Sequence, residues 1–253
     1  AALESDVCVV CVGTGTVFEG EGWDRREMCL PKCQEEMILQ IASLNPNTVV
    51  VLVAGSSMAV NWMDENVPAI LNAWYPGEQG GNAVAEVLFG DYNPGGRLPL
   101  TYYNSLDEIP AFDNYFVKGR TYQYFEGQPL YEFGYGLSYT KFRYKSKGVN
   151  VEQDTVKVSF EVSNTGKYDG DEVTQVYVKY PETGTYMPLK QLHGFKRVHI
   201  KKGKTSKVTI GVPKKDLRYW DEQERKFVTP KGEYTFMVGA SSDDIKFRET
   251  VGL

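Results

Sequence analysis

The spacing of apolar residues changes about halfway along this chain of 253 residues. Up to residue 136, continuous apolar runs alternate with stretches whose apolar residues recur every three or four positions. From residue 137 onward, apolar and polar residues alternate one by one in short segments separated by turns. The first pattern is typical of parallel strands connected by helices, and the second of antiparallel strands with one wet face. The sequence therefore predicts two domains of different class, residues 1–136 and 137–253.

In the first half, three apolar runs are predicted to be strands: residues 6–13 (DVCVVCVG), 48–53 (TVVVLV) and 67–74 (VPAILNAW). The first run is continuous, which is typical of a strand buried on both faces. Residues 31–44 and 78–89 carry apolar side chains at helical spacing. The resulting β-α-β-α order predicts a layered α/β domain with a mostly parallel sheet.

In the second half, the alternating segments are bounded by turn residues and are predicted to be strands. They are residues 155–163, 172–179, 191–200, 205–212 and 232–238. Turns recur between them at intervals that suit two packed antiparallel sheets. The second domain is therefore predicted to be an all-β sandwich.

Composition and charge exclude several kinds of partner. Hydrophobic residues make up 42% of the chain and charged residues 24%, which is typical of a folded protein. The net charge is −5, from 28 basic and 33 acidic residues, so nucleic acid is not an expected partner. No apolar run approaches the roughly 20 residues of a membrane-spanning helix, and no membrane contact is expected.

The cysteines lack the spacing of a metal site. Cys8 and Cys11 would point to opposite faces of a strand, while Cys29 and Cys33 could share a helical face without further ligands. We expect four free thiols packed as small apolar residues, with no metal or cofactor bound. Free thiols favour a reducing compartment such as the cytoplasm, and a periplasmic or secreted location stays open.

The loop of residues 13–25 (GTGTVFEGEGWDR) follows the first predicted strand and is the candidate site. Ligands of open α/β sheets gather at the carboxyl ends of strands. The loop lacks the third glycine and the immediate helix of a dinucleotide site. It holds three carboxylates and two aromatic residues: Glu19, Glu21, Asp24, Phe18 and Trp23. A carboxyl desolvated by the aromatic rings could donate a proton, and the alternative is a solvated acidic turn.

Several long motifs resemble the carboxy-terminal half of glycoside hydrolase family 3, which contains β-glucosidases and β-xylosidases. They are EGEGWDRREMCLP (19–31), NAWYPGEQGGNAVAEVLFGDYNPGGRLPLTYY (72–103) and KGRTYQYFEGQPLYEFGYGLSYTKF (118–142). A fourth, NTGKYDGDEVTQVYV (164–178), resembles the terminal fibronectin type III-like domain of that family. The resemblance implies an α/β sandwich domain followed by an immunoglobulin/fibronectin III-like sandwich. Family members have another strand and helix before the piece that resembles residues 1–13, so we expect a fragment that begins inside the α/β domain.

The resemblance also implies a retaining, exo-acting β-glycosidase mechanism. In the family, a nucleophilic aspartate lies in an amino-terminal (β/α)8 barrel, and the general acid/base glutamate comes from the α/β domain. That glutamate corresponds best to Glu21, directly before Gly-Trp-Asp-Arg, with Glu19 as the competitor. Substrate contacts are expected from Phe18, Glu19 and Trp23, and loop-fixing contacts from Asp24 and Arg25.

No segment of the chain resembles the barrel, which is therefore expected to lie on an absent segment or a separate chain. The expected partners are that barrel and a β-linked oligosaccharide or aryl glycoside, and the chain alone is expected to be inactive. The choice between glucosides and xylosides stays open. The alternative is a non-catalytic carbohydrate-binding or scaffold module. Such a module would have no reason to keep a carboxylate beside aromatic residues at the end of a strand.

Overall fold

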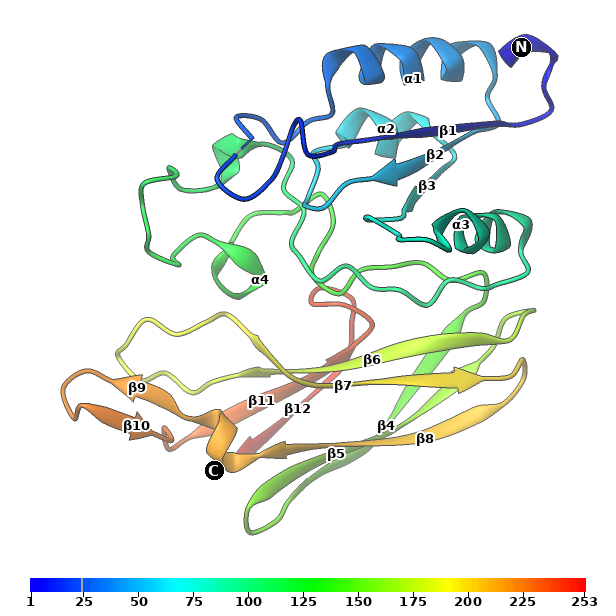
Figure 1. Ribbon diagram of the computed structural model, residues 1–253. Helices are drawn as coiled ribbons and strands as arrows, with labels where there is room; N and C mark the ends of the chain where they lie inside the picture. Colours follow the sequence, from blue (N-terminus) through cyan, green and yellow to red (C-terminus); the bar gives the residue numbers. More distant parts are fainter. Residues whose placement is uncertain (24) are drawn as a thin grey trace. The chain divides into compact units, whose positions relative to one another are not determined.

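The computed structural model describes residues 1–23 and 25–253, which form two compact units (Figure 1). Each unit consists of three stretches of chain. The first unit comprises Ala1–Asp91, Thr101–Asn114 and Gly127–Tyr131, and the second comprises Tyr92–Leu100, Tyr115–Glu126 and Glu132–Leu253. The units are thus interleaved along the chain, and the boundary expected between residues 136 and 137 stays a prediction.

The first unit contains a three-stranded parallel sheet in the order β1-β2-β3. Its strands are β1 (Cys8–Gly13), β2 (Thr48–Val53) and β3 (Ala69–Asn72). Its helices are η1 (Ala2–Glu4), α1 (Lys32–Leu44), α2 (Asn61–Asn66), α3 (Gly80–Phe89) and η2 (Leu106–Glu108). The predicted α/β layer with a parallel sheet is confirmed. Within the described residues, no helix is both long and apolar enough to cross a membrane.

Strand β1 lies at the edge of the sheet, and the expectation that it is buried on both faces is wrong. Val10 and Val12 are buried in a core that includes the fully buried Ile38 of α1. The alternate residues Val9 and Cys11 are exposed. The cysteines of the described chain are free as expected, but Cys11, Cys29 and Cys33 are exposed rather than packed.

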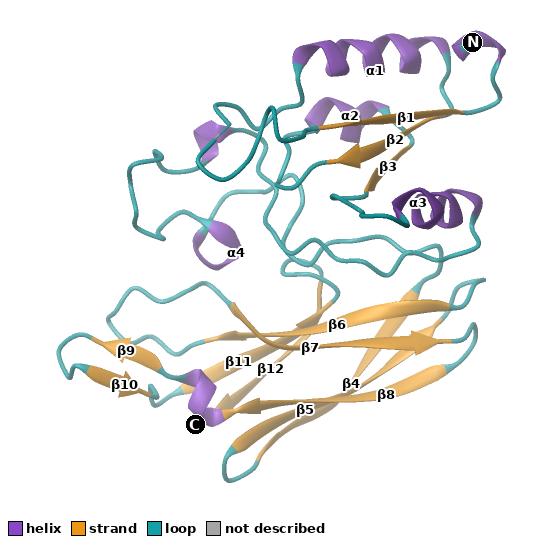
Figure 2. Ribbon diagram, viewed as in Figure 1, coloured by secondary structure: helices purple, strands orange, loops and turns teal. Residues whose placement is uncertain are grey.

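The second unit is a sandwich of two antiparallel sheets, in the orders β12-β11-β6-β7 and β4-β5-β8 (Figure 2). The strands of the first sheet are β6 (Gly170–Lys179), β7 (Gln191–Ile200), β11 (Glu233–Gly239) and β12 (Ile245–Gly252). Those of the second are β4 (Phe142–Val151), β5 (Thr155–Asn164) and β8 (Thr205–Pro213). A separate hairpin pairs β9 (Tyr219–Asp221) with β10 (Lys226–Val228), and the short helices are α4 (Thr121–Tyr124) and η3 (Lys214–Leu217). The predicted β-sandwich is confirmed.

The core of the sandwich lies between the two sheets, where Val158 and Phe160 of β5 pack with Val176 of β6 and Phe236 of β11. Strand β6 departs from the simple alternation predicted for it. Its burial is nearly continuous from Glu172 to Val178, because it is an inner strand and polar side chains on its outer face are covered as well.

His193 of β7 makes the stability of the sandwich depend on pH. Its Nε2 lies 2.8 Å from the hydroxyl of Tyr180, and burial lowers the pKa of the imidazole to about 4. Because the unfolded chain takes up this proton near pH 6.5, stabilisation is complete above that pH and is lost as the pH falls toward 4. We expect the free energy of unfolding to decrease by roughly 2 kcal/mol over this range through His193 alone.

Urea denaturation at pH 7 and pH 4.5 checks this expectation. In His193→Gln the decrease should be smaller than in the wild type by that amount. Equal decreases in the wild type and His193→Gln would show that the imidazole of His193 is not responsible.

Candidate functional site

The candidate loop starts where β1 is closely held at its carboxyl end. The side-chain amide of Gln34 accepts a hydrogen bond from the Gly13 N–H at 2.8 Å and donates one to the Gly13 carbonyl at 2.9 Å. A Cβ atom at residue 13 would lie 1.7 Å from the carbonyl oxygen of Val53 in the neighbouring strand. Only glycine therefore fits here, and the start of the loop is fixed against both α1 and β2.

Glu19 turns its carboxylate inward, to the carboxyl ends of all three strands. Oε1 accepts hydrogen bonds from Thr14 Oγ1 (2.8 Å) after β1, the Gly55 N–H (2.8 Å) after β2, and Tyr75 Oη (2.5 Å) after β3. Oε2 accepts one from Ser56 Oγ at 2.8 Å. The same oxygen lies 3.2 Å from Arg25 Nε, and the Glu19 side chain is only 13% exposed.

These donors determine the protonation state of Glu19. Burial alone would raise the pKa of the carboxyl, but the hydrogen bonds, led by that from Tyr75, outweigh it and lower the pKa to about 2. Hydrogen bonds that favour the charged form have this effect on a carboxyl. Glu19 is therefore an ionised acceptor with both oxygens occupied.

Glu21 lies two residues further on and has the opposite surroundings. The Trp23 N–H donates to the Gly20 carbonyl at 3.0 Å, which closes a tight turn around residues 21 and 22. Gly22 has φ = 76°, as the third residue of a type II turn requires. Glu21 is exposed at the tip of this turn, and within the described part of the chain its carboxyl has no hydrogen bond or ion pair.

The other residues expected at the site differ in exposure to solvent. Phe18 and Trp23 are exposed, by 50% and 71%, so neither is part of the core. Arg25 is mostly buried, and its guanidinium reaches Glu19, the hydroxyl of Ser56 and the carbonyl of Ser57. Asp24, expected to fix the loop, lies outside the described residues.

The residues that donate hydrogen bonds to Glu19 were not predicted from the sequence. Thr14, Gly55, Ser56 and Tyr75 come from three different strand ends, and no local spacing connects them. One signal was available, because each of them directly follows or lies near the end of a predicted strand, where ligands of α/β sheets gather. No group of three or more His, Cys, Asp or Glu residues suited to a metal ion occurs among the described residues.

The fold and the loop together define a protein with a parallel α/β unit and a β-sandwich unit, in which the Glu19 carboxylate is held at the carboxyl ends of the parallel strands. Residues 1–139 match the model of the glycosyl hydrolase family 3 C-terminal domain. Residues 172–242 match that of the fibronectin type III-like domain. The chain belongs to glycoside hydrolase family 3.

Comparison with similar proteins shows which part of the longer family members this chain matches. It is 39% identical to a xylan 1,4-beta-xylosidase of Xylanibacter ruminicola, over 93% of this chain and 29% of that protein. It is 38% identical to a beta-glucosidase of Kluyveromyces marxianus, over 96% of this chain and 30% of that protein. The crystal structure of the K. marxianus beta-glucosidase in complex with glucose superposes with a TM-score of 0.94 at 36% identity, covering 100% of this chain and 32% of the other. The chain thus spans about a third of the length of these relatives and corresponds to their C-terminal part.

Proposed function

We propose that this chain supplies the general acid/base of a retaining, exo-acting β-glycosidase, and that Glu21 is that residue. The observation that carries the proposal is the contrast between two neighbouring carboxylates, one accessible at the tip of a turn and one saturated by donors. A general acid must reach the leaving-group oxygen and carry a proton near the working pH. Glu19, with a pKa of about 2 and no unoccupied oxygen, does not meet these requirements.

The second carboxylate of the mechanism comes from outside this chain in our proposal. A retaining enzyme needs a nucleophile about 5–5.5 Å from the acid/base, so that one attacks the anomeric carbon while the other protonates the leaving oxygen. We assign the nucleophile to a (β/α)8 barrel that the chain meets in the complete enzyme. The substrate is a β-linked oligosaccharide or an aryl β-glycoside, and the exposed rings of Phe18 and Trp23 are suited to stack on sugar faces.

The assay compares the 253-residue chain alone with the chain joined to a barrel segment encoded beside it. We expect negligible hydrolysis of aryl β-glucosides and β-xylosides by the chain alone, because it holds only one of the two carboxylates. The joined protein should hydrolyse at least one of them with retention of configuration, followed by proton NMR of the first product formed. Substantial turnover by the isolated chain would show that the nucleophile lies within it. Inactivity of the joined protein would favour a carbohydrate-binding or scaffold module.

A further inference from the structure

We propose that Glu19 is a positioning residue. Its carboxylate anchors to the sheet the start, or root, of the turn Gly20–Trp23 that presents Glu21. The inference rests on the proposed function for its catalytic consequence, and on the contacts of Glu19 for its structural part. Glu19 would then act through Glu21 and would not touch the substrate.

The anchor requires a carboxylate and not merely a polar side chain. Each oxygen of Glu19 faces one donor that is unable to become an acceptor: the Gly55 N–H at Oε1 and the Arg25 Nε–H at Oε2. The hydroxyl groups of the cluster can rotate to accept a hydrogen bond, but these two groups cannot. In Glu19→Gln, the new NH2 group faces one of them in either orientation, so that donor loses its partner.

Glycines flank the residue at the tip of the turn, and before the turn the Glu19 N–H donates to the Gly15 carbonyl at 3.0 Å. Only Gly20 separates Glu19 from Glu21, and Gly22 follows directly. Glycine has wide backbone freedom, so a turn flanked by glycines adopts one conformation only where its ends are held. The Trp23 N–H to Gly20 carbonyl bond closes the turn, and the Glu19 carboxylate fixes its first end to the sheet.

The backbone that follows β2 and β3 positions the groups that donate hydrogen bonds to Glu19. Trp74 has φ = 54°, a left-handed conformation that is unusual for a large side chain and persists only where the surroundings impose it. The next residue, Tyr75, donates to Glu19 and lies over Gly55, where a Cβ atom would be 2.6 Å from the tyrosine ring. The lack of a side chain at Gly55 therefore lets the phenol reach Glu19.

Hydrogen exchange on the 253-residue chain tests the structural part without any enzyme assay. We expect the Trp23 amide to exchange at least tenfold faster in Glu19→Gln than in the wild type, because the turn opens when its root is released. Tyr75→Phe removes one hydroxyl donor and should give a smaller increase in the exchange rate. This milder variant keeps the inference testable if Glu19→Gln does not fold. Glu65→Gln, an exposed glutamate of α2, is the matched control and should match the wild type. Unchanged exchange in Glu19→Gln overturns the inference whatever the enzyme assay shows.

Kinetics of the complete enzyme test the catalytic part. For β-glycosides with poor leaving groups we expect Glu19→Gln to lower kcat about 10- to 100-fold with KM changed less than about threefold, since proton donation depends on the placement of Glu21. For activated aryl glycosides the loss in kcat/KM, which reports the first step, should be less than about threefold, because that step does not need proton donation. Equal losses on both substrates, or none, would overturn a positioning role. If the wild-type enzyme hydrolyses neither substrate, the proposed function fails while the exchange result still decides the anchor.

Discussion

Replacing Glu21 by glutamine in the complete enzyme should lower kcat/KM for substrates with poor leaving groups by about 10²- to 10⁴-fold. A poor leaving group departs only if its oxygen is protonated as the glycosidic bond breaks, and the amide of glutamine is too weak an acid to donate that proton. An activated aryl leaving group departs as a stable anion, so its loss in the first step should be less than about tenfold. Steady-state kinetics with an alkyl and a dinitrophenyl β-glycoside measure the difference.

Two further variants make this result specific. Glu65→Gln carries the same chemical change at an exposed position of α2 and should leave both rates unchanged. Glu19→Gln should show the same preference as Glu21→Gln with a smaller loss, as argued above. Equal losses on both substrates in Glu21→Gln would assign proton transfer to another residue.

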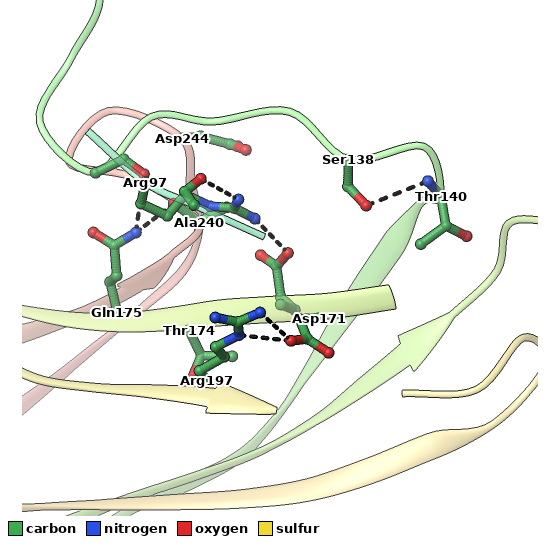
Figure 3. A network of polar contacts seen from close by, with 12 residues as sticks. Arg97, Ser138, Thr140, Asp171, Thr174, Gln175, Arg197, Ala240 and Asp244 are labelled. Carbon is green, nitrogen blue, oxygen red and sulfur yellow. Dashed lines mark hydrogen bonds and ion pairs between the residues drawn. The ribbon is translucent and has the colours of Figure 1, made fainter. Parts of the chain in front are cut away.

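Replacing Arg97 by methionine should destabilise the sandwich unit by about 3–5 kcal/mol. Arg97 and Glu172 form an ion pair at 2.8 Å, with side chains only 8% and 3% exposed. Tyr144 donates to the same carboxylate at 2.6 Å, and burial raises the pKa of Glu172 even with Arg97 beside it. Figure 3 shows Arg97 directed toward strand β6. It also shows the ion pair between Asp171 of β6 and Arg197 of β7. Without Arg97, Glu172 would be a buried charge with a hydroxyl as its remaining partner.

Urea denaturation at pH 7 measures this loss. Arg248→Met removes an exposed arginine of β12 and should change the free energy of unfolding by less than about 0.5 kcal/mol. The double variant Arg97→Met with Glu172→Gln should be more stable than Arg97→Met alone, because the unpaired charge is gone. A double variant as unstable as the single one would show that the packing of the Arg97 side chain, and not its charge, is responsible.

Much of the fold follows from local patterns in the sequence. The apolar run that forms β2 and the alternation that forms β7 predict these strands with their observed bounds. The six-residue helix α2 was not predicted, because it is too short for a helical period to emerge. Strands β4 and β12 were not predicted, because the polar residues Ser146 and Glu249 occupy inward-facing positions and interrupt the apolar alternation.

The burial of β1 and β6 depends on their neighbours and could not be predicted from composition. Strand β1 is as apolar as a central strand, yet it lies at an edge of the described sheet. Strand β6 contains Glu172 and Gln175, yet it is buried on both faces because Arg97 and backbone carbonyls pair with these groups. A hydrophobicity pattern describes the polarity of each residue. It does not show which partners from distant parts of the chain will bury that residue.

The candidate site shows the same limit more sharply. Motif resemblance located the loop and its two glutamates, but Glu19 and Glu21 are equivalent in type and differ by only two positions. What separates them is a set of donors 5, 36 and 56 residues from Glu19 along the chain, at Thr14, Gly55 and Tyr75. Their convergence is a property of strand order in the sheet, which local spacing does not encode.

The interleaving of the two units bears on how enzymes of this kind can be recombined. The ion-pair partner of Glu172 lies in the stretch Tyr92–Leu100, well before the first strand of the sandwich. If the sandwich of this chain were transplanted into another family member at a single crossover near residue 137, Glu172 would be separated from Arg97. Grafts that carry Tyr92–Leu100 and Tyr115–Glu126 along with the sandwich would keep the buried charge and its counterion from the same parent.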